Sequence, residues 1–93
     1  MALKLNAATL TKIEKMIEEA GYVLRYERGT FQSGYCILEQ KKVVVLNKFL
    51  QTEGRINTVL DLIPHLTIDT NQLTPDNRKL YEEVLVYIAI QEK

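Results

Sequence analysis

The sequence has few of the residues and patterns that mark several classes of protein. It contains a single cysteine, Cys36, so no internal disulfide can form. Its longest unbroken apolar run, Val84 to Ile90, covers seven residues, far fewer than the roughly 20 that span a bilayer. Residues 1–7 hold no apolar stretch long enough for the core of a signal peptide. These absences exclude a disulfide scaffold and a membrane-spanning chain, and they predict a cytoplasmic protein.

An excess of charge of either sign is also missing. Twelve Lys and Arg residues balance twelve Asp and Glu residues, so no overall field recruits a nucleic acid or an anionic membrane. The 93 residues are 46% apolar and 26% charged, which is typical of one globular domain. The charges are distributed unevenly: residues 25–55 carry six basic and three acidic side chains, and residues 56–93 carry three basic and six acidic ones. Such an asymmetry would allow one copy to pair with another.

Three helices are predicted from apolar stripes and end signals. The first stripe has spacings of three and four residues and consists of Leu10, Ile13, Ile17 and Ala20. Asn6 or Thr9 is placed to cap this helix, and Gly21 to end it.

The second and third helices have end signals of their own. The second is predicted to follow Thr52 and to end at Pro64. The third follows Thr74 and Pro75, a capping residue and a proline suited to the first helical position. Its last two turns are apolar nearly all round, which predicts burial on more than one side.

Between the first two helices, alternation with a period of two predicts three strands. The first covers residues 22–27, and Gly29 and Gly34 bracket the loop after it. Residues 35–39 and 42–47 are predicted to form a hairpin around Gln40–Lys41, with Leu38 opposite Val43 and Tyr35 opposite Leu46. Both faces of this hairpin are apolar, so the second face needs a cover from a helix or another chain. The expected fold is a single two-layer α+β domain over residues 1–93. Along the chain, we expect a helix, then a three-stranded antiparallel meander, then two helices.

A hairpin that ends in residues 43–47, followed by a helix in residues 55–66, resembles the layout of small zinc peptidases of the zincin class. In those enzymes a sheet leads into a helix with two histidine ligands four residues apart and a glutamate base beside the first. His65 matches the second histidine, but Asp61 stands at the first histidine position and Leu62 at the glutamate position. Pro64 also interrupts the helix. The resemblance implies at most a catalytically degenerate relative, and we expect no metal or cofactor.

Two other catalytic patterns are incomplete. Glu39-Gln40-Lys41 resembles the acidic-x-Lys signature of restriction-endonuclease-like nucleases, which need a further acid on the preceding strand. Only Glu27 could supply that acid. Cys36 could act as a nucleophile only beside a base, and His65 is the sole histidine. A hairpin turn and a small core cysteine explain these residues without catalysis, so the sequence favours a non-catalytic protein over an enzyme.

The leading functional hypothesis is a small non-catalytic binding module with its ligand or partner contacts near the glycine-bracketed loop. Phe31 is apolar in a loop where a polar residue would serve, and Arg28, Lys48 and Arg55 could contact an anion. Weak nucleic-acid binding is an alternative, because five of the seven aromatic residues fall within residues 22–49, which overlap the basic segment. The zero net charge argues against strong binding of phosphate.

A surplus of apolar surface predicts self-association. A sheet with two apolar faces and a final helix that is apolar nearly all round present more surface than three short helices can cover. We expect a homodimer formed through the third helix, the uncovered sheet face or both. The residues expected at the dimer contact are Val84, Val86, Tyr87 and Ile90. A different protein partner would fit the same surface.

Overall fold

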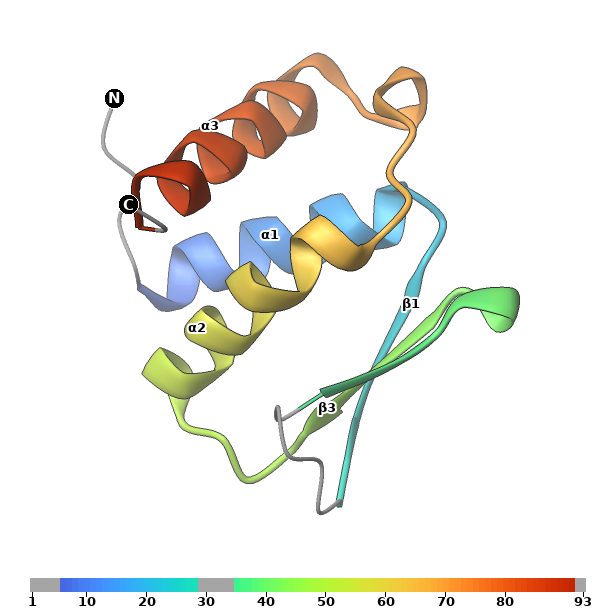
Figure 1. Ribbon diagram of the computed structural model, residues 1–93, viewed down its shortest axis with the longest axis vertical. Coiled ribbons are helices and arrows are strands. Elements are labelled where there is room, and N and C mark those ends of the chain that lie inside the picture. The colour runs from blue at the N-terminus through green and yellow to red at the C-terminus, as the bar shows by residue number, and fades with distance from the viewer. Residues whose placement is uncertain (1–5, 29–34, 92–93) are drawn as a thin grey trace.

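Figure 1 shows the computed structural model, which describes residues 6–28 and 35–91. The helices and strands follow in the order α1 (Ala7–Glu19), β1 (Val23–Glu27), β2 (Tyr35–Leu38), β3 (Val43–Asn47), α2 (Thr52–Leu62) and α3 (Pro75–Gln91). Short 3-10 turns lie at η1 (Glu39–Lys41), η2 (Ile63–His65) and η3 (Thr70–Gln72). The expected α+β class is confirmed. Among the residues described, no helix combines the length and the apolar character needed to cross a membrane.

The sheet is mixed, and the expected antiparallel meander is wrong. Strand β3 lies in the centre, parallel to β1 and antiparallel to β2. Val44 and Leu46 of β3 have no exposed surface, as expected for a strand paired on both sides. Strand β1 instead carries Arg25 and Glu27, which form an ion pair of 2.9 Å and suit a solvent-facing edge. The period-two pattern identifies strands, but it does not say which strands are neighbours.

The register of the hairpin is as predicted, although its connection differs. Leu38 pairs with Val43, and the other β2–β3 pairs follow in step. In place of a two-residue turn at Gln40–Lys41, the chain forms η1 and then places Lys42 in the left-handed conformation with φ 55°. The N–H of Lys42 donates to the carbonyl of Glu39 at 3.2 Å. The same four residues, 39–42, connect Leu38 to Val43 in both forms of the turn, so the pairing of the two strands is the predicted one.

The helices form two tiers on one face of the sheet. Helix α1 packs on β1 and lies beside α2, and α3 packs on both from the side away from the sheet (Figure 1). The structure therefore has three tiers in place of the two expected layers. The side chains with no exposed surface join all three tiers: Ile13, Met16, Ile17, Val44, Leu46, Val59, Leu62, Ile63 and Val84.

The helix ends lie close to their sequence signals. Asn6 Oδ1 accepts a hydrogen bond of 2.9 Å from the first turn of α1, and Gly21, with φ 102°, follows the end of that helix. At the start of α3, Thr74 Oγ1 accepts from the N–H of Asn77 at 3.3 Å. Glu19 Oε1 accepts from the N–H of Thr74 at 2.6 Å and from Asn77 Nδ2 at 3.1 Å. These bonds, the one from the Thr74 backbone above all, lower the pKa of Glu19.

Tyr22 connects three segments that are distant in the sequence. Its side chain is buried just before β1. Its hydroxyl donates to Glu39 Oε1 at 2.5 Å and accepts from the N–H of Thr67 at 2.9 Å. The ammonium of Lys42 lies 4.8 Å from the centroid of the Tyr22 ring. The alternation of residues 22–27 predicts that Tyr22 faces inward, but it does not predict these polar partners.

Two glycine substitutions should change the stability in opposite directions. The φ of 102° at Gly21 strains any residue with a Cβ, so Gly21→Ala should lower the free energy of unfolding by about 1–2 kcal/mol. Gly54 lies inside α2, where a Cβ would meet Leu50 at an ordinary contact distance of 3.5 Å. Gly54→Ala should therefore raise the free energy of unfolding by about 0.5–1 kcal/mol. Urea denaturation measures both changes, and effects of the same sign would contradict the two backbone conformations.

Candidate functional site

One end of the sheet gathers basic residues from two strands. Because β1 and β3 are parallel, both end at this edge, where Glu27 pairs with Asn47. The N–H of Lys48 donates to the carbonyl of Glu27 at 3.1 Å and extends the pairing beyond the strands. Arg28 and Lys48 therefore leave the sheet side by side. We call the group formed by Arg28, Lys48, Phe49 and Arg55 the basic corner.

Phe49 projects from a tight turn that follows β3. Its N–H donates to Asn47 Oδ1 at 3.0 Å, and the N–H of Leu50 donates to the carbonyl of Asn47 at 3.2 Å. Asparagine favours such turns because its side chain can replace a backbone acceptor. The turn leaves Phe49 65% exposed, more than any other large apolar residue described by the structure. The exposed ring is therefore accessible to a ligand at this turn.

Two cations flank the Phe49 ring. The guanidinium carbon of Arg28 lies 5.7 Å from the ring centroid, and Lys48 Nζ lies 5.5 Å from it. Neither cation forms an ion pair with a carboxylate of residues 6–28 or 35–91; the ion pair in that part of the chain joins Arg25 to Glu27. Like charges held near one ring repel each other, and a bound anion would offset the repulsion.

Arg55 holds the turn against α2. Its Nε donates to the carbonyl of Leu50 at 2.8 Å, and its Nη2 donates to the carbonyl of Lys48 at 3.2 Å. Its guanidinium carbon also lies 4.8 Å from the centroid of the Tyr26 ring. Arg55 thus adds positive charge to the basic corner, but its geometry makes it mainly a positioning residue for Lys48 and Phe49.

A partly buried carboxyl group lies next to Arg55. Glu14 of α1 accepts a hydrogen bond from the hydroxyl of Tyr26. Burial raises the pKa of Glu14; the positive charge of Arg55 opposes that rise, and the negative charge of Glu18 adds to it. Glu14, Tyr26 and Arg55 come from α1, β1 and α2, so this cluster joins the three elements that support the basic corner.

The structure brings together most of the ligand contacts expected from the sequence. Arg28, Lys48 and Arg55 meet at one end of the sheet, and Phe31 lies outside the described residues. The ligand contacts expected from the sequence leave out Phe49, the ring near which two of these cations lie; only the nucleic-acid alternative counts it, as one of five aromatic residues. A signal for it was present, because Phe49 is an apolar residue between a strand and a helix in the basic segment.

The catalytic patterns suggested by the sequence do not assemble. Cys36 lies in β2 and His65 in η2, and among the described residues no group of three or more His, Cys, Asp or Glu side chains could hold a metal ion. Glu27 lies at the Asn47 end of the sheet, whereas Glu39 follows β2 at the opposite end. Asp61 lies in α2 and His65 in η2, so the two zincin-like positions are not on one helix.

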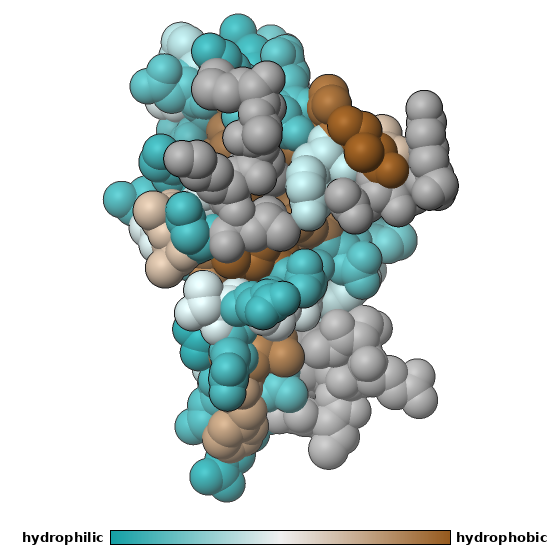
Figure 2. Space-filling view, turned by 90° about the vertical axis from the view of Figure 1, so that its left-hand side faces the viewer, coloured by the Kyte–Doolittle hydropathy of each residue, from teal (hydrophilic) through white to brown (hydrophobic). Residues whose placement is uncertain are grey.

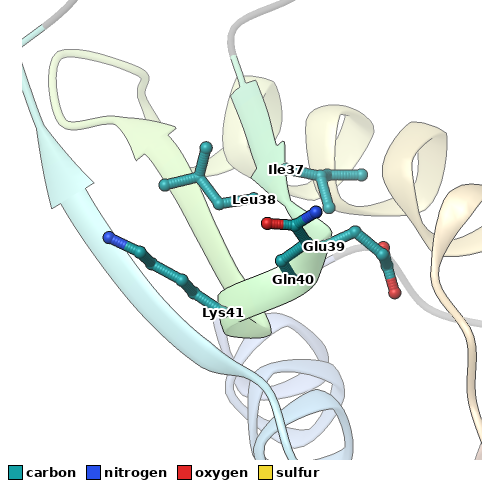
Figure 3. Close-up of a pocket in the computed structure, with 5 residues that line it drawn as sticks. All are labelled: Ile37, Leu38, Glu39, Gln40 and Lys41. Carbon is teal, nitrogen blue, oxygen red and sulfur yellow. The ribbon is translucent and has the colours of Figure 1, made fainter.

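Hollows elsewhere on the surface offer less chemistry. One of about 330 Å³ is lined by residues 37–41 at the end of the hairpin. Figure 3 shows the side chains of Glu39 and Lys41 in this hollow pointing away from each other, and Glu39 already bonds Tyr22. Another hollow of about 440 Å³ lies between α1 and α3. Its lining residues are Lys12, Asp76, Asn77, Lys79, Leu80 and Glu83.

Glu14 and Glu19, both on α1, should give stability opposite pH dependences. The pKa of Glu14 is raised from its ordinary 4.5, so the stability it contributes is present below pH 4.5 and is lost as the pH rises through the raised pKa. Glutamine is neutral at every pH, so Glu14→Gln should match the wild type in acid and be more stable at neutral pH.

The pKa of Glu19 is lowered, so the stability that Glu19 contributes is present above pH 4.5 and is lost as the pH falls through the lowered pKa. Glu19→Gln should be less stable at neutral pH and match the wild type in acid.

Urea denaturation of the wild type and both variants across this pH range measures the two effects. Each variant serves as the control for the other, since both remove one carboxylate from the same helix. Parallel pH dependences of Glu14→Gln and Glu19→Gln would contradict the assigned environments.

Comparison of the chain with protein-family models, with curated proteins and with solved structures gave no match in any of the three.

Proposed function

We propose that this protein is a non-catalytic binding module that holds an anionic ligand at the basic corner. The observation that carries the proposal is the placement of Arg28 and Lys48, 5.7 Å and 5.5 Å from the centroid of the same exposed ring. Both cations lack a carboxylate partner within the described part of the chain. Arg28 and Lys48 are twenty positions apart in the sequence, and the pairing of β1 with β3 brings them together.

The rigidity of the turn supports the same proposal. Asn47, Leu50 and Arg55 hold the backbone around Lys48 and Phe49 through four hydrogen bonds of 2.8–3.2 Å. A site that is already ordered loses less conformational entropy when a ligand binds. The cations themselves are exposed, so salt should weaken the binding.

Removal of the two cations should abolish most of the anion binding. Titration calorimetry with inorganic tripolyphosphate at low salt should show binding by the wild type. The double variant Arg28→Ala/Lys48→Ala should bind at least about tenfold more weakly, because hydrogen bonds to charged groups contribute about 1.5–3 kcal/mol each. The control Lys12→Ala/Lys15→Ala removes the same charge from the exposed face of α1 and should bind like the wild type. Equal losses in the two variants would show that only net charge matters and would refute a localised site.

We further propose that the module acts as a homodimer paired through α3. Val86 and Ile90 are 59% and 60% exposed, and Leu85 beside them is 38% exposed. Residues four apart lie on the same face of a helix, so Val86 and Ile90 form an apolar surface on α3. Figure 2 shows apolar atoms projecting among polar ones at the level of α3.

The other two residues expected at the dimer contact belong to the fold of a single chain. Val84 has no exposed surface, and Tyr87 is partly buried against the core. The final helix therefore buries one side on α1 and α2 and leaves the other open, although its sequence predicts burial on more than one side. A second copy of the chain would supply the missing cover.

The open face of the sheet is the alternative surface for pairing. Val23 and Leu38 are 53% and 44% exposed, and both pair with Val43, so the three form one apolar row across the sheet. Both faces of the hairpin are apolar, as the sequence predicts, but the helices cover only the face that carries Val44 and Leu46. The three helices all lie on the other side of the sheet (Figure 1).

Charged substitutions on the two surfaces should separate these alternatives. Val86→Glu/Ile90→Glu should convert a dimer into a folded monomer, because both side chains are exposed in the single chain. Val23→Glu/Leu38→Glu places the same charges on the sheet face and should leave the dimer intact. Native mass spectrometry measures the assembly of each variant. A monomeric wild type, or dissociation by the sheet variant alone, would contradict pairing through α3.

A further inference from the structure

The basic corner offers more than positive charge, because two of its cations, Arg28 and Lys48, lie near the exposed aromatic ring of Phe49. From this juxtaposition we infer that the basic corner binds a nucleotide unit, with a base stacked on the ring of Phe49 and a phosphate held by Arg28 and Lys48. The inference rests on the proposed anion site and adds the chemical class of its ligand. It assigns a role to Phe49 that an anion site alone does not require.

The exposed ring indicates a planar part of the ligand. A bare phosphate gains nothing from an apolar neighbour, yet the turn presents Phe49 at 65% exposure and fixes its backbone through the bond from its N–H to Asn47 Oδ1 at 3.0 Å. Every nucleobase has a face that stacks on an aromatic side chain, and such stacking does not depend on the base sequence. The ring therefore supplies the contact that cations alone would lack.

The flanking cations indicate a phosphate next to the base. Without a ligand, Arg28 and Lys48 lie within cation–π distance of the Phe49 ring. A phosphate would attract both cations more strongly than the ring does, since it carries a full negative charge and accepts hydrogen bonds from each. Their movement toward a phosphate would also uncover the face of the ring for a base.

A free nucleotide and a single strand present this same chemistry, whereas a duplex does not, because its bases are already stacked inside. Two cations predict binding that is weak and only moderately sensitive to salt. The logarithm of the affinity for a single strand should fall with a slope of about −1.4 against the logarithm of the salt concentration, or about −0.7 for each of two phosphates neutralised.

The test measures the fluorescence anisotropy of two labelled probes of equal length and charge, a short oligothymidylate and a strand of abasic sites. The wild type should bind the oligothymidylate more tightly. Phe49→Leu should weaken binding of the oligothymidylate by about tenfold and leave binding of the abasic strand unchanged, because only the base contacts the ring. Phe49→Trp, which enlarges the stacking surface, should bind the oligothymidylate at least as tightly as the wild type. Phe49 is exposed, so these variants should fold, and their urea denaturation curves check this.

Each outcome separates this inference from the function on which it rests. Arg28→Ala/Lys48→Ala should weaken binding of both probes. Equal binding of the two probes by the wild type, or no effect of Phe49→Leu, would overturn the nucleotide assignment while leaving an anion site in place. Failure of both probes and of tripolyphosphate to bind would refute the proposed function as well. If unlabelled thymidine monophosphate displaces the labelled oligothymidylate as effectively as the unlabelled strand does, that result would support the inference and identify a free nucleotide as the ligand.

Discussion

The central position of β3 is the constraint on which the rest of the structure depends. Its pairing with both other strands leaves Val44 and Leu46 without exposed surface beneath the helices. Parallel pairing with β1 also brings two strand ends to the same edge of the sheet. Arg28 and Lys48 meet there because of that pairing; in an antiparallel meander, neighbouring strands would end at opposite edges. The same strand order thus determines both the core and the candidate site.

Polar side chains of α1 and of Tyr22, which follows it, connect elements around the sheet. Glu14 accepts from Tyr26 of β1, Glu19 accepts from residues at the start of α3, and Tyr22 joins Glu39 to the segment after η2. Such contacts stabilise a fold only when the buried polar atoms find partners, and no buried side-chain nitrogen or oxygen in the described residues lacks one. The position of each tier therefore depends on directed bonds as well as on apolar packing.

The surfaces proposed for binding and for pairing lie apart. The basic corner is at the end of the sheet where β1 and β3 finish, whereas α3 forms the tier farthest from the sheet (Figure 1). A dimer paired through α3 would leave Arg28, Lys48 and Phe49 accessible in both copies. Two such sites on one ligand strand would bind it more tightly than one, provided that the strand can reach both. Self-association and ligand binding are therefore compatible in this fold.

Local patterns in the sequence determined the elements, and tertiary structure decided how they are combined. Asn6, Gly21 and Thr74 mark helix ends because a cap depends on bonds within a few residues, and the β2–β3 register follows from two adjacent strands joined by a short turn. The order of the strands and the third tier depend on competition for burial among segments far apart in the sequence. The partners of Tyr22 and the cations around Phe49 depend on the same competition, since they lie close together only after the strands have paired. Periodicity predicts which side of an element is buried, but the neighbour that buries it is decided by the packing of the whole chain.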